Sequence, residues 1–404
     1  MRFFLTFFCT IFFTYFFSQD SLKITYYNLL NFPSSQQDRV DTLKKILDFI
    51  QPDIFVVNEL TSFNGGALIK NNVLNSGSSN NFQSALYFDG PDTDNLLFYD
   101  KNKFELYSQQ QIPTQLRDIS EYVLYYKNQV DIVNDTSFIF IYSIHLKAGS
   151  SSTNEELRRQ EAKTFKEFLV NSNRNQRLFV GGDFNFYYNT EPACQEILYG
   201  EGLDLIDPIN QMGNWHNNSS YNNIHTQSTR SATGGYAGGA YGGMDDRFDI
   251  IFMSNDVIDG SSGLQYMINT YVADGQDGSY FNQSINNTNN SQVPQDIAKA
   301  LFYMSDHLPV SLMFSINPPF SVLTSNNQKI NVKLFQSTKH LVLDFPREEE
   351  LKINIYDLTG KCLYQDRFDS QKHIEVELSF LPKGFYILDC ILQNDRINHK
   401  FIIE

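Results

Sequence analysis

Residues 178–186 read LFVGGDFNF, an apolar run that ends in an acid and an amide, Asp183 and Asn185. A short apolar run next to glycines is typical of a strand in the interior of a sheet. Three further segments follow the same pattern, and each ends a predicted strand in polar side chains: ITYYNLLNF at 24–32, IFVVNEL at 54–60 and YMSDHLPV at 303–310. The four segments lie far apart in the chain but carry the same kinds of polar group.

The polar residues of these segments, with one residue from each of two further apolar segments, form a candidate site. The two further segments are IFIYSIHLKAG at 139–149 and DRFDIIFMS at 246–254, and the full set is Asn28, Glu59, His145, Asp183, Asn185, Asp249, Asp306 and His307. Carboxylate and amide oxygens suit a hard divalent cation, which can bind a phosphate while a nearby base deprotonates a water. The set therefore indicates a metal-dependent phosphoesterase.

Each of these residues also has a structural interpretation. A single Asp or Asn at a strand end is most often a turn or cap residue, and a single histidine is more often structural than catalytic. The ordered occurrence of all eight residues favours the functional interpretation. The remaining histidines lack such neighbours and are predicted to be structural: His216, His225, His340, His373 and His399.

Length and composition describe a folded protein with a large core. The chain has 404 residues, of which 41% are hydrophobic, enough for one large sandwich and a small extra domain. The formal net charge is −15, and the acidic excess lies before residue 318. Such a surface repels polyanions unless local basic groups or a bound metal reverse the field. Bulk charge therefore does not support a nucleic-acid substrate, and it makes metal dependence more necessary.

The first 19 residues, MRFFLTFFCTIFFTYFFSQ, form an apolar run with one early basic residue. This pattern predicts a cleaved secretory signal, with an uncleaved membrane anchor as the alternative. No other stretch is apolar for long enough to span a bilayer. Three cysteines remain after cleavage, and they define no disulfide framework, although one bridge between Cys362 and Cys390 is compatible with the sequence.

Apolar runs and amphipathic stretches alternate through the body of the chain, as in strands joined by helices. Helices are predicted from Asp38 until Pro52 and over 154–170, the second with Glu155, Arg158, Arg159 and Lys166 facing solvent. Strands are predicted at 22–30, 53–57, 84–88, 95–100, 121–127, 137–146, 177–182, 248–254 and 308–316.

Two long polar loops interrupt this alternation. Residues 212–247 contain the single tryptophan and a glycine-rich run, and residues 274–300 are rich in Asn, Gln and Ser. Such loops either select the substrate or are mobile insertions without a function, and the sequence leaves both interpretations open. The glycine run lacks the Lys and Ser or Thr that end a phosphate-binding P-loop.

Two prolines, Pro318 and Pro319, mark a linker, after which the pattern changes to short alternating strands at 351–360, 361–368, 373–380 and 384–393. Their spacing predicts a small antiparallel sandwich. This second domain has no cluster of acids with histidine, so we do not expect it to be catalytic.

Asn28, Glu59, His145, GGDFN, DRFDIIF and SDHLPV, in this order, resemble the endonuclease/exonuclease/phosphatase superfamily, the DNase I-like fold, over residues 22–316. INIYDLTGKCLYQ, LPKGFYILDC and the closing HKFIIE resemble the C-terminal sorting domain of the type IX secretion system over residues 320–404. The resemblances imply an α/β, four-layered αββα sandwich followed by a small all-β sandwich. The implied domains are a signal peptide at 1–19, a catalytic domain at 20–317 and a sorting domain at 320–404.

Chemistry and resemblance assign roles to the eight residues. Glu59 is the expected main ligand of Mg²⁺, with Mn²⁺ or Ca²⁺ also compatible, and Asn28 and Asp306 help to hold the ion. His307 is the expected general base or electrostatic partner, and Asp249 fixes its tautomer. The other expected roles are activation of the attacking water, binding of a phosphate oxygen and donation to the phosphate, by Asp183, Asn185 and His145 respectively. Glutamates in the family often orient a histidine like His145, and the candidates here are Glu105 and Glu121.

The predicted function is a Mg²⁺-dependent phosphodiesterase that is secreted or carried to the cell surface by type IX machinery and acts on extracellular DNA or RNA. A phospholipid phosphodiesterase and a phosphate-monoester phosphatase share the core chemistry and are the enzymatic alternatives. A surface binding or adhesion protein is the alternative from another class, but a binding module has no need of all eight groups.

Overall fold

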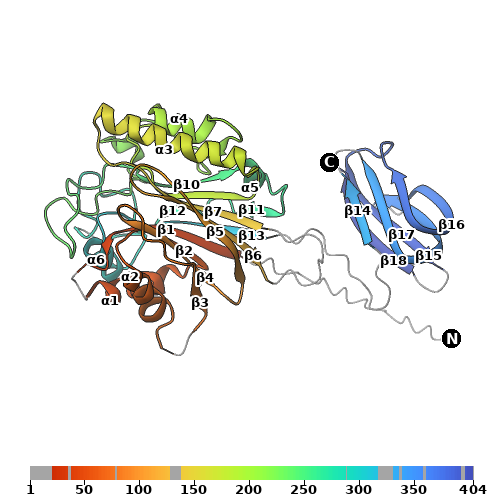
Figure 1. Ribbon diagram of the computed structural model, residues 1–404, viewed down its shortest axis with the longest axis horizontal. Coiled ribbons are helices and arrows are strands. Elements are labelled where there is room, and N and C mark those ends of the chain that lie inside the picture. Colours follow the sequence, from red (N-terminus) through yellow and green to blue (C-terminus); the bar gives the residue numbers. More distant parts are fainter. Residues whose placement is uncertain are drawn as a thin grey trace, which may run out of the picture. The chain divides into compact units, whose positions relative to one another are not determined.

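The computed structural model describes residues 21–34, 38–77, 80–127, 138–287, 289–316, 331–335, 339–357, 361–392 and 396–403. The signal predicted at 1–19 and the linker prolines lie outside these ranges. The chain divides into two compact units between Asn317 and Pro318. The larger, N-terminal unit is built from two sheets and their flanking helices (Figure 1).

The first sheet contains seven strands in the order β11-β13-β1-β2-β4-β3, with β12 also paired to β13. Only one of its pairs, β1 with β2, is parallel among the described strands. A parallel pair needs a crossover, and helix α1 (Asp38–Ile50) supplies it. The strands are β1 (Ser21–Phe32), β2 (Ile54–Leu60), β3 (Phe82–Ser84), β4 (Asp94–Asp100), β11 (Leu264–Tyr266), β12 (Val272–Ala273) and β13 (Val310–Ile316).

The second sheet contains six strands in the order β5-β6-β7-β8-β10-β9 and has the same plan. Its one parallel pair among the described strands, β7 with β8, is joined by helix α3 (Ser152–Asn171). The strands are β5 (Phe104–Ile112), β6 (Ile119–Tyr126), β7 (Phe138–His145), β8 (Leu178–Asp183), β9 (Leu205–Ile206) and β10 (Asp249–Ser254). Each sheet thus contains one β-α-β unit.

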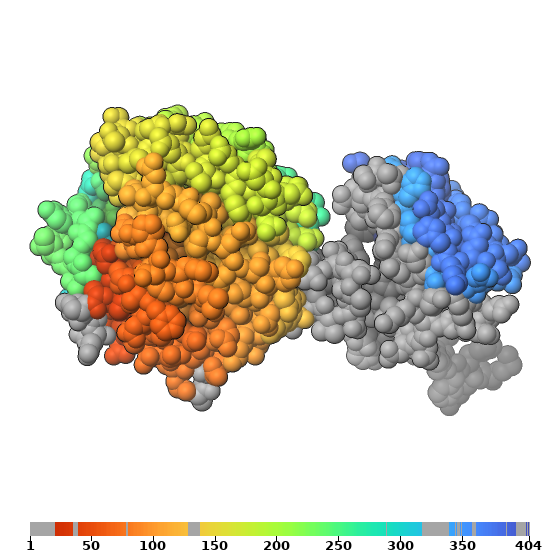
Figure 2. All heavy atoms as spheres, viewed as in Figure 1, coloured from red at the N-terminus to blue at the C-terminus, as the bar shows by residue number. Residues whose placement is uncertain are grey.

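The two sheets pack face to face, and helices cover both outer faces. Tyr26 and Val56 of the first sheet share a buried cluster with Phe179 and Ile251 of the second. Helix α3 and helix α4 (Pro192–Tyr199) cover the second sheet, and they form the upper surface in Figure 2. The first sheet is covered by α1, α2 (Phe63–Leu68), a π-helical turn (Ile69–Leu74) and α6 (Gln295–Met304). The predicted four-layered αββα fold is confirmed.

Most predicted elements are present, and the errors have local causes. The strand predicted at 84–88 ends at Ser84, because Leu86 and Phe88 are exposed and pair with no strand. Helix α6 was not predicted, because it begins inside the polar stretch 274–300. Its apolar residues Ile297, Leu301 and Met304 share one face. Further short elements are α5 (Asn255–Asp259) and a 3-10 turn (Ser219–Tyr221).

Two charged residues of α3 that were predicted to face solvent are buried. Arg158 forms an ion pair with Glu191, with Nε 2.5 Å from Oε1, and donates to two backbone carbonyls. Lys166 donates to the carbonyl of Leu203. Both side chains find partners in the connection from β8 to β9, which the helical pattern alone does not reveal. The prediction was correct for Arg159, which is partly exposed and pairs with Glu156.

The C-terminal unit is all-β and antiparallel, with the strand order β14-β15-β17-β18 and β16 paired to β15. Its strands are β14 (Asn331–Phe335), β15 (His340–Asp357), β16 (Cys362–Glu377), β17 (Gly384–Leu392) and β18 (Arg396–Ile403). The two strands predicted at 361–368 and 373–380 are one long strand, β16. The unit has its own buried cluster, which includes Leu343, Ile353, Ile374 and Leu388.

The disulfide considered for this unit is absent. Cys362 and Cys390 are free thiols, the first exposed and the second buried in the core. Strand β15 lies between them, because Cys362 pairs with Tyr356 and Cys390 with Ile353. No helix in the described part of the chain is long and apolar enough to cross a membrane.

Candidate active site

The two parallel strand pairs bring four of the candidate residues together. Asn28 lies near the end of β1, Glu59 near the end of β2, and His145 and Asp183 end β7 and β8. Asn28 joins the two sheets, because its Nδ2 donates to Glu59 Oε1 and to Asp183 Oδ2, both at 3.0 Å. The carboxyl ends of parallel strands are where α/β folds commonly place ligands.

Two glycines before Asp183 permit this close approach of the sheets. A Cβ at Gly181 would lie 2.7 Å from the ring of Tyr26. Gly182 has a φ of +133°, and a Cβ there would lie 2.0 Å from the carbonyl oxygen of Ile144. The GGD sequence is therefore required by packing at the position where the acid enters the site.

Glu59, His145 and Asp183 offer one ligand atom each, and these atoms lie within 4.8 Å of one another. His145 Nε2 is 3.5 Å from Asp183 Oδ2 and 3.9 Å from Glu59 Oε1, too far for strong hydrogen bonds. Burial raises the pKa of Glu59, and burial raises the pKa of Asp183 to about 7. A divalent cation fits between the partly buried carboxyl of Glu59 and the buried carboxyl of Asp183, and it would favour the ionised form of both.

The side chains of Asn28 and Asp306, the other two expected metal ligands, have different hydrogen-bond partners. Asn28 directs its amide nitrogen to the carboxylates, and its Oδ1 accepts from the backbone of Leu30. Asp306 is buried beside the cluster, where its Oδ2 accepts from the backbone of Ala240 at 2.6 Å and its Oδ1 has no hydrogen-bond partner in the described part of the chain. Ser305 fastens this segment to β1 by donating to the carbonyl of Asn28 at 2.7 Å. The ligand set of Glu59, Asn28 and Asp306 stays a prediction.

His307 lies between two acids. Its Nδ1 is 2.8 Å from Asp249 Oδ2, and its Nε2 is 3.6 Å from Asp183 Oδ2. Burial alone would lower the pKa of His307, but the carboxylates of Asp249 and Asp183 outweigh burial and raise the pKa well above its usual range. The contact with Asp249 has the geometry expected of a group that fixes the tautomer and orientation of the ring.

His145 has the opposite electrostatic environment. Burial lowers the pKa of His145 well below its usual range, and the guanidinium of Arg117 lowers it further. The pKa values of the two imidazoles are therefore shifted in opposite directions, that of His307 upward and that of His145 downward. Environments that separate the pKa values of like groups in this way are common where two groups have different catalytic roles.

Neither glutamate proposed as the partner of His145 has that role. Glu121 accepts from Arg174 and from Tyr142, on the far side of β7, and Glu105 pairs with Lys127. The Nδ1 atom of His145 has no hydrogen-bond partner among the described residues. Asn185 is close by and donates from Nδ2 to the carbonyl of Leu146 at 3.1 Å, which ties the turn after β8 to the end of β7.

Gln227 is a residue of the site that sequence reasoning missed. Its Nε2 lies 2.6 Å from His307 Nε2 and 3.3 Å from Asp306 Oδ2. It belongs to the polar loop 212–247, and a single glutamine in such a loop carries no recognisable signal. Only the fold brings it to the histidine.

The glycine-rich part of the same loop is fastened beside the site. Arg230 donates to the carbonyls of Phe302 and Gly238, and the backbone of Gly242 and Gly243 donates to the carbonyl of Arg230. Gly239 has a φ of +92°, and a Cβ there would lie 2.8 Å from the carboxyl of Asp306. These contacts favour a role for the loop in the site over a mobile insertion.

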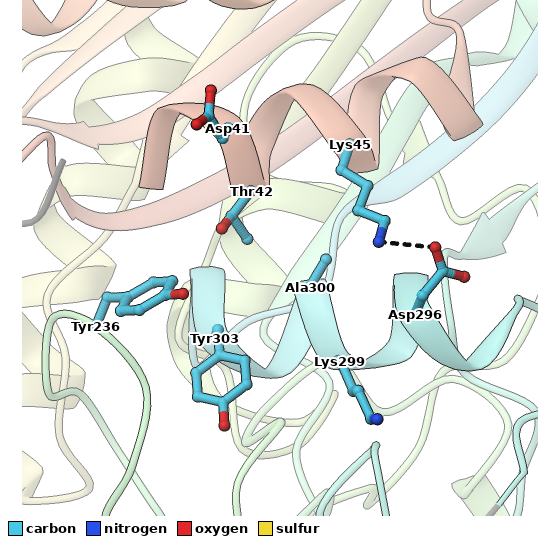
Figure 3. Close-up of a pocket in the computed structure, with 8 residues that line it drawn as sticks. All are labelled: Asp41, Thr42, Lys45, Tyr236, Asp296, Lys299, Ala300 and Tyr303. Atoms are coloured by element: carbon cyan, nitrogen blue, oxygen red, sulfur yellow. Dashed lines mark ion pairs between the residues drawn. The ribbon is translucent and has the colours of Figure 1, made fainter. Parts of the chain in front are cut away.

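A surface pocket of about 360 Å³ lies where this loop meets α1 and α6 (Figure 3). Tyr236 and Tyr303 line one end with ring centroids 5.3 Å apart. The other lining residues include Lys299 and Asp41, and Lys45 in an ion pair with Asp296 at 2.8 Å. Two segments connect the pocket with the cluster: Tyr303 precedes Asp306 by three residues, and Tyr236 belongs to the loop whose Ala240 donates to Asp306.

Comparison with known proteins gives one family match and several structural likenesses. Residues 326–404 match the secretion system C-terminal sorting domain. The resemblance stated for the tail is thereby confirmed. A search of curated proteins found no match.

Three of the similar solved structures illustrate the likeness of the larger unit. D. rerio TDP2 in complex with a single-strand DNA product is 14% identical, and the match covers 74% of this chain and 100% of that chain with a TM-score of 0.47. An endonuclease/exonuclease/phosphatase family protein from Bacteroides thetaiotaomicron is 14% identical, with 74% and 100% of the two chains covered and a TM-score of 0.46. The mannosyl-6-phosphatase of the same species is 15% identical, with 73% and 100% of the two chains covered and a TM-score of 0.46.

Proposed function

We propose that this protein is an exported, divalent-metal-dependent phosphodiesterase that hydrolyses nucleic acid. The observation that carries the proposal is the meeting of Glu59, His145 and Asp183 at the ends of the two parallel strand pairs, with the charged His307 next to Asp183. Acids that bind a cation, together with one charged and one neutral imidazole, suit phosphoryl transfer to water.

The cation would be held at Glu59, with Asp183 and His145 as the neighbouring ligands, and when bound it would polarise a phosphoryl oxygen. His307, held in its charged form by Asp249, donates to an oxygen of the phosphate as negative charge develops. Asp183 orients the attacking water through Oδ2, the oxygen that faces His307. Asn185, positioned by its bond to the carbonyl of Leu146, holds a phosphate oxygen.

The pocket of Figure 3 supports a substrate larger than a single phosphate ester. A pair of tyrosine rings offers a stacking surface for a base, and Lys299 offers a charge for the next phosphate. The acidic net charge opposes a polyanion, so these local groups and the cation have to supply the attraction. The match of residues 326–404 to a sorting domain supports export or attachment to the cell surface.

The test is a hydrolysis screen of the purified chain against plasmid DNA, RNA, sphingomyelin, bis(p-nitrophenyl) phosphate and p-nitrophenyl phosphate, each with Mg²⁺ and with EDTA. We expect cleavage of a nucleic acid and of the activated diester, and no cleavage with EDTA. Hydrolysis of sphingomyelin alone would replace the nucleic acid by a phospholipid, and hydrolysis of the monoester alone would indicate a phosphatase. No hydrolysis of any substrate would favour a binding protein.

A further inference from the structure

A second histidine–aspartate pair lies at the rim of the candidate site. His216 Nδ1 is 2.7 Å from Asp246 Oδ1. The His216 side chain is 48% exposed and the Asp246 side chain 11% exposed, whereas His307 and Asp249 are 4% and 1% exposed. Asp246 and Asp249 both come from the DDRFD sequence that leads into β10. The chain therefore contains two histidine–aspartate pairs of the same kind, one buried and one open to solvent.

Gln227 connects the two pairs. It forms isolated antiparallel bridges with Asp246 on one side and with His307 on the other. Its side chain also contacts His307, with Nε2 2.6 Å from the ring Nε2. Since bridged segments lie about 5 Å apart, Asp246 and His307 are separated by a single intervening residue. The open pair thus borders the same site and not a distant surface.

Tyr187 orients the ring of His216. Its backbone carbonyl accepts from the His216 N–H at 3.3 Å, and the two rings meet edge to face with centroids 5.1 Å apart. Tyr187 itself packs against Phe248, at a centroid distance of 5.1 Å. The tyrosine follows Asn185 by two residues, so the same turn after β8 carries residues of the cluster and the support of His216.

A histidine in this setting has the properties of a proton donor. A general acid must reach the reacting group and also exchange protons with solvent, and a partly exposed ring at the rim of the site meets the second requirement. The buried pair cannot supply this proton easily, because His307 is enclosed by Asp249, Asp183 and Gln227. The buried pair can therefore act on the phosphate, and the exposed pair on the leaving group.

We propose that His216 is the general acid that protonates the leaving oxygen of the phosphodiester, and that Asp246 is its positioning residue. The inference rests on the proposed function. As the bond from phosphorus to the leaving oxygen breaks and the bond to the water oxygen forms, the proton on His216 Nε2 passes to the leaving oxygen. The neutral ring then regains a proton from solvent, and the proton lost by the water is released to solvent through Asp183.

Leaving groups of different basicity test this role. A nitrophenolate leaves without help, whereas the ribose oxygen of a nucleotide requires protonation. We therefore compare kcat of wild type, His216→Gln and Asp246→Asn on bis(p-nitrophenyl) phosphate and on the dinucleotide TpT. For both variants we expect a loss of about a hundredfold or more on TpT and a change of less than about threefold on the nitrophenyl diester, the usual scale of general acid catalysis.

His373→Gln is the matched control, because His373 is also exposed and pairs with a carboxylate, Glu375, at 3.3 Å in the C-terminal unit. It should leave kcat on both substrates unchanged. Near-ultraviolet circular dichroism of each variant reports whether the fold is retained. An equal loss on both substrates, or no loss on TpT, would overturn the proposal. Wild type that hydrolyses neither diester would instead refute the proposed function, and the assignment of His216 with it.

A metal titration tests the alternative that His216 binds a cation instead of donating a proton. His216, Asp245 and Asp246 offer ligand atoms within 4.8 Å of one another. If the group held a cation, His216→Gln would reduce the number of Mn²⁺ ions bound per chain in an equilibrium dialysis measurement. The proposal requires the same Mn²⁺ stoichiometry in wild type and in the variant, and a lower value in the variant would overturn it.

Discussion

His145 and Asp183 are register partners at the carboxyl ends of two neighbouring parallel strands, with His145 Nε2 3.5 Å from Asp183 Oδ2. The first sheet repeats this relationship, where Asn28 is opposite the residue before Glu59. Each parallel pair follows from one helical crossover, and face-to-face packing of the sheets brings the two pairs of strand ends together. The candidate site therefore forms where the strand ends of two β-α-β units, one in each sheet, meet.

The first prediction concerns the cation. Because burial disfavours the ionised carboxyl groups of Glu59 and Asp183, Mg²⁺ or Mn²⁺ should bind the folded chain and raise its melting temperature. At a hundred times the dissociation constant the stabilisation would be about 2.7 kcal/mol. Glu59→Gln should lose both this shift and the hydrolysis. Differential scanning calorimetry with EDTA and with added metal measures the shift, and a folded chain that is fully active in EDTA would rule out the metal mechanism.

A second prediction concerns the two imidazoles. His307→Ala removes a charge near the phosphate and His145→Ala removes a neutral donor or ligand, so each should lower kcat by about a hundredfold or more. Substrate affinity should change less than turnover. His225→Ala is not a fair control, because His225 is buried and its Nε2 donates to the backbone carbonyl of Trp215 at 2.9 Å. His340→Ala in the C-terminal unit should retain wild-type kcat, and near-normal turnover of His307→Ala would remove the central assignment.

Two adjacent arginines of α3 provide a stability prediction. Arg158 is fully buried with Glu191, so Arg158→Ala leaves a carboxylate in the core without its partner. Loss of one member of a buried pair usually costs about 3–5 kcal/mol of the free energy of unfolding. Arg159→Ala removes only the exposed pair with Glu156 and should cost less than about 1 kcal/mol. Urea denaturation of both variants measures the difference, and equal losses would show that the burial of Arg158 is misassigned.

The sequence predicted the parts of the site that depend on local pattern. Asp183, Glu59 and His145 each follow an apolar run that specifies a buried strand, and the strand places the residue at its end. Gln227 and the partners of Arg158 could not be predicted, because their contacts join segments that are distant in sequence and carry no local signal. Strand β5 was missed because its second half contains the polar run 108–111, SQQQ, which does not alternate with apolar residues.

The pH dependence of stability can be tested at Asp274, which is partly buried after β12 and accepts from Ser311. Burial raises the pKa of Asp274 to about 7. A carboxyl group with a raised folded pKa stabilises the fold at low pH, and this contribution is lost as the pH rises through about 7. The stability of Asp274→Asn relative to wild type should therefore be greater at pH 8 than at pH 5, by on the order of 2 kcal/mol.

Urea melts in EDTA at the two pH values measure this effect, and EDTA removes any contribution of bound metal. Asp41→Asn is the control for the substitution itself, because Asp41 is exposed on α1. A constant difference between Asp274→Asn and wild type across this range would show that the carboxyl is ionised throughout.

The last prediction concerns the C-terminal unit. The body has its own buried clusters, and residues such as Ile353 and Leu388 form a separate core in the tail. The residues of the candidate site all precede residue 318, so a chain of residues 20–317 should fold and retain the kcat of the full chain on bis(p-nitrophenyl) phosphate. In the native host the same truncation should leave the protein in the periplasm, because residues 326–404 match a sorting domain. Activity of the purified short and long chains, with cell fractionation of strains that express each, separates the two roles. Loss of hydrolysis with the tail would place part of the active site there, and normal appearance of the short chain in the medium would show that export does not depend on it.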